Sequence, residues 1–122
     1  MTLTHYTDMV VRIMDDYVKK NGTDTIMTNK EIQDYLYKQR QNGNDWFLLS
    51  DFCYNIVNRG ISSHYPNDKH LFKWVRRGHY LILGSNYPYT GEVEWTGHGG
   101  LIVGKWDKGT LTNWNPNLMQ HP

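Results

Sequence analysis

The stretch from Phe72 to Leu83 constrains the fold more than any other part of this sequence. Two runs of β-branched, aromatic and aliphatic residues flank the segment Arg76-Arg77-Gly78-His79. This is the pattern of two antiparallel strands joined by a tight turn. Glycine at position 78 supplies the positive φ that such a reversal needs. The sequence therefore predicts a β-hairpin with a basic tip.

Three helices are predicted before this hairpin. Apolar residues recur with a helical period over about residues 4–20, and a second helix is predicted over about residues 29–39. Its start is a capping box, in which the Thr28 hydroxyl accepts from the amide of Glu31 and the Glu31 carboxylate reaches back. A third, short helix is predicted from about residue 49, because five apolar residues share one helical face: Leu49, Phe52, Cys53, Ile56 and Val57.

A helix followed by a polar loop and a two-stranded hairpin resembles the winged helix-turn-helix superfamily. The specific match is the wing-like spacing of Phe72, Val75, Gly78, Tyr80 and Ile82. The resemblance covers about residues 4–83, including a short strand near residues 23–27 that would pair with the wing. It implies an α+β fold with a three-helix winged helix-turn-helix core, a β-hairpin wing and a C-terminal β-rich extension.

The composition changes after residue 83. Seven of the eleven Gly, three of the four Pro and three of the five Trp lie beyond it. Residues 92–96 alternate polar and apolar as a half-exposed strand does, and residues 101–114 are typical of a hairpin that turns at Gly109. We therefore expect a core over 1–83 and an extension over 84–122, packed as one compact domain, with a frayed tail from Asn115.

The large aromatic residues of this extension allow two interpretations. The favoured one is that they cap the hydrophobic core, and the alternative is that they form a patch for a protein partner, since Trp and Tyr are common interface anchors. The residues concerned are Tyr87, Tyr89, Trp95, Trp106 and Trp114.

Charge is unevenly distributed along the chain. The net charge is only +1, but residues 38–80 carry seven Lys and Arg against three Asp and Glu. The segments on either side, 1–37 and 81–122, have balances of −2 and −1. Positive charge confined to one block suits a localised anionic partner rather than a general coating of nucleic acid.

Cysteine content and hydropathy bear on the compartment. The single cysteine, Cys53, can form no internal disulfide, which fits a reducing environment. The N-terminus has no signal-peptide pattern, and no apolar run is longer than about four residues. We therefore expect a cytoplasmic protein with no membrane partner.

A candidate nucleic-acid site follows from the resemblance, because winged helices place the third helix in a groove and the wing on the backbone. Asn55 or Asn58 would read adenine, and the wing arginines would contact phosphate. The leading hypothesis is a small DNA-binding regulatory protein whose partner is duplex DNA. The candidate residues are Asn55, Asn58, Arg59, Ser62, Ser63, His64, Tyr65, Lys69, Lys73, Arg76, Arg77 and His79.

Two other interpretations of the basic residues remain open. One is a protein-interaction module, such as a small phage-type inhibitor or adaptor of a host defence protein, whose basic hairpin faces an acidic protein. The other is that these charges are solvated and keep the hairpin soluble. Steep salt dependence of binding would favour phosphate contact.

The sequence offers little for catalysis or metal binding. The positions of Cys53, His64, His70 and His79 match no standard zinc spacing. The segment 98–100 is His-Gly-Gly, but no Gly-x-Ser-x-Gly elbow accompanies it, so a turn is the better interpretation. Residues 15 and 16, two adjacent aspartates, are expected to be solvated. We expect no enzyme, no metal and no cofactor.

Overall fold

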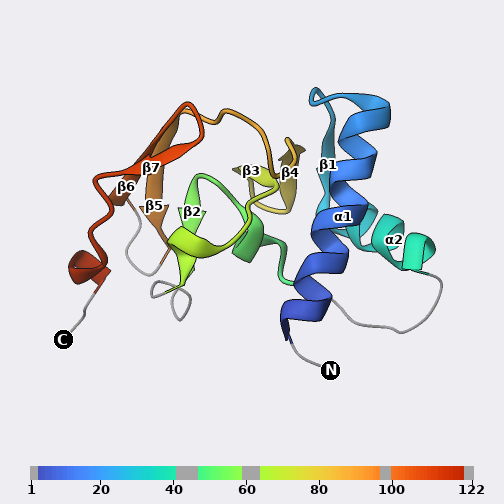
Figure 1. Cartoon of the computed structure of the whole chain (residues 1–122), viewed down its shortest axis with the longest axis horizontal. Helices are drawn as coiled ribbons and strands as arrows, with labels where there is room; N and C mark the ends of the chain where they lie inside the picture. Colours follow the sequence, from blue (N-terminus) through green and yellow to red (C-terminus); the bar gives the residue numbers. More distant parts are fainter. Residues whose placement is uncertain (1–2, 41–46, 59–63, 97–99, 120–122) are drawn as a thin grey trace.

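A computed structural model of the chain describes residues 3–40, 47–58, 64–96 and 100–119. In this part of the chain, two helices lie beside two small sheets (Figure 1). The helices are α1 (Leu3–Asn21) and α2 (Asn29–Arg40). One sheet has the order β1 (Ile26–Thr28), β4 (His79–Ile82), β3 (Phe72–Arg76). The other has the order β2 (Ile56–Val57), β5 (Gly91–Trp95), β6 (Leu101–Asp107), β7 (Thr110–Thr112).

The start of α2 confirms the predicted capping box. The Thr28 hydroxyl accepts a hydrogen bond from the amide of Glu31 at 3.1 Å, and the Glu31 carboxylate accepts one from the amide of Thr28 at 2.8 Å. These bonds occupy amides that the first helical turn leaves without partners. The bonds from Thr28 also lower the pKa of the Glu31 carboxyl.

The basic hairpin is confirmed as β3 and β4. Its turn contains Gly78 with φ of 73°, a backbone conformation that residues with a Cβ rarely adopt. The strand predicted near residues 23–27 is confirmed as β1, which begins at Ile26 and pairs antiparallel with β4. The predicted C-terminal hairpin is confirmed as β6 and β7, which are also antiparallel.

The predicted third helix is wrong, and with it the three-helix winged helix-turn-helix core. Residues Leu49–Phe52 form a single 3₁₀ turn, η1. Cys53 then makes an isolated parallel bridge with Phe72, and the chain bends at Tyr54 and Asn55 before it enters β2. Ile56 packs in one hydrophobic core and Val57 in another. A strand buried on both sides is apolar almost throughout, and such a short run resembles a helical face in sequence. The described fold is two multi-stranded sheets with a small helical part.

The segment 52–57 joins the two sheets. At its start, the Leu71 amide donates to the carbonyl of Phe52 at 2.6 Å, and the Tyr54 amide donates to the carbonyl of Phe72 at 2.8 Å. At its end, the amides of Glu94 and Thr96 donate to the carbonyls of residues 55 and 57, both at 3.0 Å. One strand-like segment therefore pairs first with β3 and then with β5.

Two hydrophobic cores lie on either side of this segment. The first fills the space between the helices and the sheet of β1, β4 and β3, and includes Val10, Met14, Ile32, Leu36, Phe72 and Ile82. The second lies against the sheet of β5 to β7 and includes Tyr54, Val57, Tyr65, Tyr89, Trp95 and Trp106. Tyr87 and Trp114 pack against this second core. The aromatic residues of the extension thus belong to a core, as the favoured interpretation expected, but to a second core that they share with residues 54, 57 and 65.

The frayed tail predicted from Asn115 is wrong for the residues that the structure describes. The amide of Asn115 donates to the carbonyl of Val103 at 2.8 Å. Residues Pro116–Met119 then form a 3₁₀ turn, η3, that buries the side chain of Met119. The apolar contact of Met119 with the second core holds this turn in place.

His70 is buried among the aromatic rings of the second core. Its ring lies 4.3 Å from the ring of Tyr65 and 5.2 Å from that of Trp106, measured between centroids. Its Nε2 donates to the carbonyl of Tyr65 at 3.2 Å. Burial disfavours the charged imidazolium and lowers the pKa of His70 from 6.5 to about 4.

His70 should make the protein less stable in mild acid. The unfolded chain takes up a proton on this histidine below about pH 6.5, whereas the folded chain does so only near pH 4. With respect to this titration, the folded protein therefore has its full stability above about pH 6.5 and loses stability as the pH falls toward 4. We expect the titration of His70 to lower the free energy of unfolding by about 2 kcal/mol between pH 7.5 and pH 5.

Denaturant unfolding of the wild type and His70→Phe at both pH values measures this contribution. The variant keeps an aromatic ring but cannot titrate, so its stability should change with pH by about 2 kcal/mol less than that of the wild type. Parallel pH profiles for the two proteins would show that His70 does not titrate in this way.

Candidate functional site

The sheet of β1, β4 and β3 has one face on the first core, and its other face carries charged side chains beside Leu81, which packs against the second core. Phe72, Tyr80 and Ile82 point into the first core under the helices. Side chains alternate along a strand, so Lys73 and His79 point to the opposite face. Arg76 pairs with His79 across the ladder and joins them on that face.

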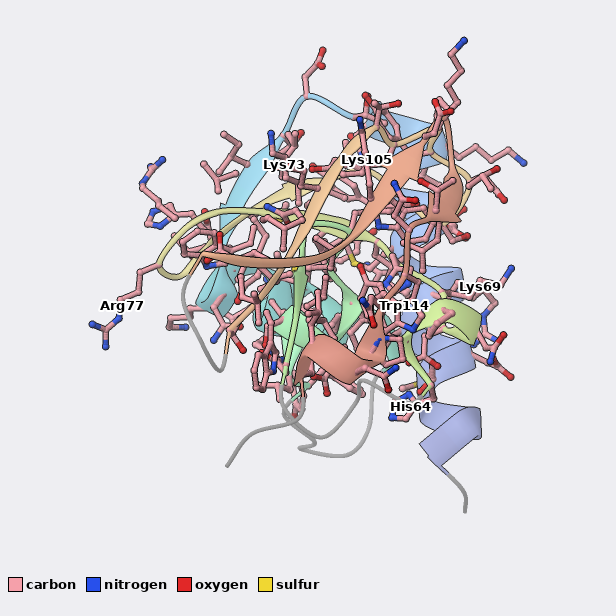
Figure 2. All side chains as sticks on the ribbon, turned by 90° about the vertical axis from the view of Figure 1, so that its left-hand side faces the viewer. His64, Lys69, Lys73, Arg77, Lys105 and Trp114 are labelled. Atoms are coloured by element: carbon pink, nitrogen blue, oxygen red, sulfur yellow. The ribbon has the colours of Figure 1, made fainter. Side chains whose placement is uncertain are left out.

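Four side chains define what we call the basic face: Lys73, Arg76, Arg77 and His79. The first three are exposed, and His79 is half-buried. Figure 2 shows Arg77 extending away from the ribbon at the tip of the hairpin. His79 donates from Nδ1 to the carbonyl of Arg77 at 2.9 Å, which fixes the imidazole against the turn.

The charges of the basic face are not neutralised nearby. Neither Lys73, Arg76 nor Arg77 forms an ion pair with another residue in the described ranges. By contrast, Lys20 and Lys30 on the helices form i,i+4 ion pairs with Asp16 and Asp34 at 3.0 and 2.8 Å. The hairpin therefore presents a positive potential that is available to an anionic partner.

Asn55 has a structural role in the fold. Its Nδ2 donates to the carbonyl of Trp74 at 2.8 Å, and its Oδ1 accepts from the amide of Trp74 at 2.8 Å. The side chain thus occupies the main-chain groups at the outer edge of β3. The Asn55 amide thus replaces the main-chain hydrogen bonds that a further strand residue would make with Trp74.

Asn58 is also committed within the molecule. Its Nδ2 donates to Ser50 Oγ at 2.7 Å and to Asp51 Oδ1 at 2.8 Å, and its Oδ1 accepts from Thr96 Oγ1 at 3.1 Å. The two amides predicted to read bases therefore stabilise loops and a strand edge. The predicted groove contact by a third helix is wrong, because the described residues contain no such helix.

Tyr65 lies in the second core. The side chain is fully buried, and its hydroxyl donates to the carbonyls of Tyr54 and Cys53 at 2.8 and 3.1 Å. The phenol therefore has no exposed surface with which to contact phosphate. Burial is the main reason that the pKa of Tyr65 is raised.

The remaining predicted residues do not join the basic face. His64 is bonded to Asp68 at 2.6 Å, and Figure 2 shows His64 and Lys69 well separated from Arg77 across the molecule. Arg59, Ser62 and Ser63 lie outside the described residues. Of the nine candidates that the structure describes, four lie on one hairpin, and these are the residues of the basic face.

A second feature went unpredicted. Asp15, expected to be solvated, is half-buried and accepts hydrogen bonds from the amide of Ser85 at 2.7 Å and from Ser85 Oγ at 2.5 Å. A pocket of about 450 Å³ lies beside it. Contacts between positions 70 residues apart leave no periodic signal, so sequence patterns could not have revealed this site.

The fold is that of a small helix-and-sheet protein, and the basic face is a cationic surface on its hairpin of β3 and β4. A family known as a domain of unknown function, DUF7225, matches residues 7–113, and the chain belongs to this family. The uncharacterized protein YnaC of Bacillus subtilis (strain 168) is 36% identical over 93 residues, or 74% of this chain. The chain spans 34% of the length of that curated relative. No solved structure matches this chain.

The length and apolar character of a helix decide whether it can cross a membrane. Neither α1 nor α2 has both the length and the apolar character needed to cross a membrane, within the part of the chain that the structure describes.

Replacing Asn55 tests its structural role. Asn55→Ala removes two hydrogen bonds to Trp74 and leaves the edge of β3 uncovered, so we expect the free energy of unfolding to fall by about 1–3 kcal/mol. Denaturant unfolding measures the change. Asn86→Ala, at an exposed asparagine, serves as the control and should change stability by less than about 0.5 kcal/mol. Equal stability of Asn55→Ala and wild type would contradict this role.

Proposed function

We propose that this protein binds nucleic acid through the phosphate backbone, using the basic face of Lys73, Arg76, Arg77 and His79. The observation that carries the proposal is a set of exposed cations on one hairpin, Lys73, Arg76 and Arg77, which have no acidic partner among the described residues. Proteins that bind nucleic acid concentrate positive charge in this way, and most of their non-specific affinity comes from phosphate contacts.

The chemistry of these side chains suits phosphate oxygens. The guanidinium groups of Arg76 and Arg77 each offer a planar fork of donors, which matches two phosphate oxygens at once. Lys73 adds a compact charge on the same strand as Arg76. Main-chain pairing of β3 with β4 holds these side chains in a fixed order along the hairpin.

The proposal concerns the backbone and not the bases. Asn55 and Asn58, the residues expected to read adenine, are engaged within the protein. We therefore propose binding with little dependence on base sequence, and duplex DNA serves as the ligand for the test. A cytoplasmic location forms part of the proposal and fits the buried, unpaired thiol of Cys53.

The double variant Arg76→Ala/Arg77→Ala should bind duplex DNA more weakly than the wild type. Each lost phosphate contact reduces the slope of log K against log salt concentration by about 0.9, so the slope should fall by about 2. Stability should change little, because exposed substitutions usually cost within about 0.5 kcal/mol each. Fluorescence anisotropy from about 50 to 200 mM salt measures both affinity and slope.

A matched control removes the same charge from another place. Lys20→Ala/Lys30→Ala takes two cations from the helices, where both are already ion-paired. This variant should keep the wild-type slope. Equal losses in both double variants would indicate a general charge effect, and no salt-dependent binding by the wild type at about 50 mM salt would rule out the proposal. The basic face would then be assigned to an acidic protein partner.

A further inference from the structure

A pocket of about 450 Å³ lies between the second half of α1 and the connection from β4 to β5. This volume is in the range of pockets that hold small organic ligands. Its walls come from two segments that are far apart in sequence: Asp15, Val18, Lys19 and Thr23 on one side, and Leu83, Gly84, Asn86, Tyr87 and Pro88 on the other. It is separate from the basic face.

One wall carries a carboxylate held in a fixed orientation. Both oxygens of Asp15 accept hydrogen bonds from Ser85, at 2.7 Å from the amide and 2.5 Å from the hydroxyl. No cation in the described residues forms an ion pair with Asp15. Each carboxylate oxygen has a second lone pair, so Asp15 can still accept from a ligand.

The backbone opposite Asp15 approaches closely because residue 84 is glycine. A Cβ on Gly84 would lie 3.2 Å from Asp15 Oδ1 and 3.3 Å from Val18 Cγ2. The φ of Gly84 is 88°, in the region that favours glycine. The Tyr54 hydroxyl donates to its carbonyl at 2.6 Å. These contacts shape the pocket before any ligand arrives.

Lys19 supplies the opposite charge one helical turn beyond Asp15. Residues four apart on a helix lie about 5–6 Å apart at Cβ, yet the two side chains form no ion pair with each other in the described structure. The neighbouring pair, Asp16 and Lys20, has the same spacing and does form one, at 3.0 Å. Asp15 is engaged with Ser85 instead, which leaves the Lys19 ammonium available to a ligand.

The rest of the wall is apolar. Val18, Leu83, Tyr87 and Pro88 offer aliphatic and aromatic surface beside the two charges. We propose that this pocket binds a free amino acid with an apolar side chain. The ligand's ammonium group would contact Asp15, its carboxylate would contact Lys19, and its side chain would pack on the apolar wall.

This choice of ligand follows from the pairing of charges. A simple amine would meet the like charge of Lys19, and a simple carboxylic acid would meet the like charge of Asp15. A zwitterion satisfies both groups and removes apolar surface from water as well. The charges of the pocket therefore select against either half of the ligand alone.

L-Phenylalanine is the probe for the test. Titrated into the ¹⁵N-labelled full chain, it should cause saturable amide shifts centred on residues 15–19 and 83–88, with a dissociation constant of about 1 mM or below. N-acetyl-L-phenylalanine lacks the ammonium group, and the methyl ester lacks the carboxylate. Both should bind at least about 10-fold more weakly than phenylalanine, because each loses one charged contact with the pocket.

Two variants in the pocket and two control variants at adjacent positions test where phenylalanine binds. Lys19→Met removes the ammonium, which forms no side-chain hydrogen bond with the part of the chain that the structure describes. Asp15→Asn removes charge while keeping an oxygen for Ser85. Each should weaken phenylalanine binding by about 10-fold or more. Asp16→Asn and Lys20→Met change the adjacent, exposed pair and should leave binding unchanged.

Several results would overturn the proposal. These are the absence of saturable shifts up to about 20 mM phenylalanine, equal binding of the acetylated or esterified probe, and equal losses in the Asp16 and Lys20 variants. If Asp15→Asn proves unfolded by circular dichroism, Lys19→Met alone decides, because the exposed Lys19 side chain bonds no other described residue.

Discussion

The hydrogen bonds of the segment 52–57 are the constraint on which the rest of the structure depends. This segment pairs with β3 through Phe52 and Tyr54 and then with β5 through Asn55 and Val57. Where it leaves β3, the Asn55 side chain takes over and bonds both main-chain groups of Trp74. The carbonyl of Tyr54, no longer facing a strand, accepts from Trp106 Nε1 at 2.7 Å and from Tyr65 Oη at 2.8 Å. These bonds give partners to the main-chain carbonyls of residues 52, 54, 55 and 57, where the chain passes from one sheet to the other.

The same junction determines which surfaces are exposed. Ile56 pairs with Glu94 and faces the first core, whereas Val57 pairs with Trp95 and faces the second. The two cores therefore lie on opposite faces of the joined sheets. The helices lie beside the sheet of β1, β4 and β3 (Figure 1). Lys73 lies on the face away from the first core and is exposed, although Leu81, its partner on β4, packs against the second core. A basic surface thus arises from how the strands are paired, without any recognition helix.

Local signals predicted the local elements well. The helical periodicity of residues 4–20, the Thr28 capping box and the turn at Gly78 each depend on residues close in sequence, and all three are confirmed. The segment 49–57 was misassigned because its apolar spacing fits a helix, whereas its hydrogen bonds come from β3 and β5. Likewise, Asn55 was expected to contact DNA, since nothing in the sequence reveals that Trp74 would lie beside it. Sequence patterns found the charged hairpin but not the long-range contacts that surround it.

Native-state hydrogen exchange tests the central claim that residues 52–57 make the two sheets one cooperative unit. The informative amides are those of Tyr54 and Leu71 on the β3 side and of Glu94 and Thr96 on the β5 side. If the junction couples the sheets, all four should exchange with the same free energy, close to that of global unfolding, and respond equally to added denaturant. A β5 pair that exchanges through a much smaller opening than the β3 pair would contradict the claim and show that the two sheets open independently.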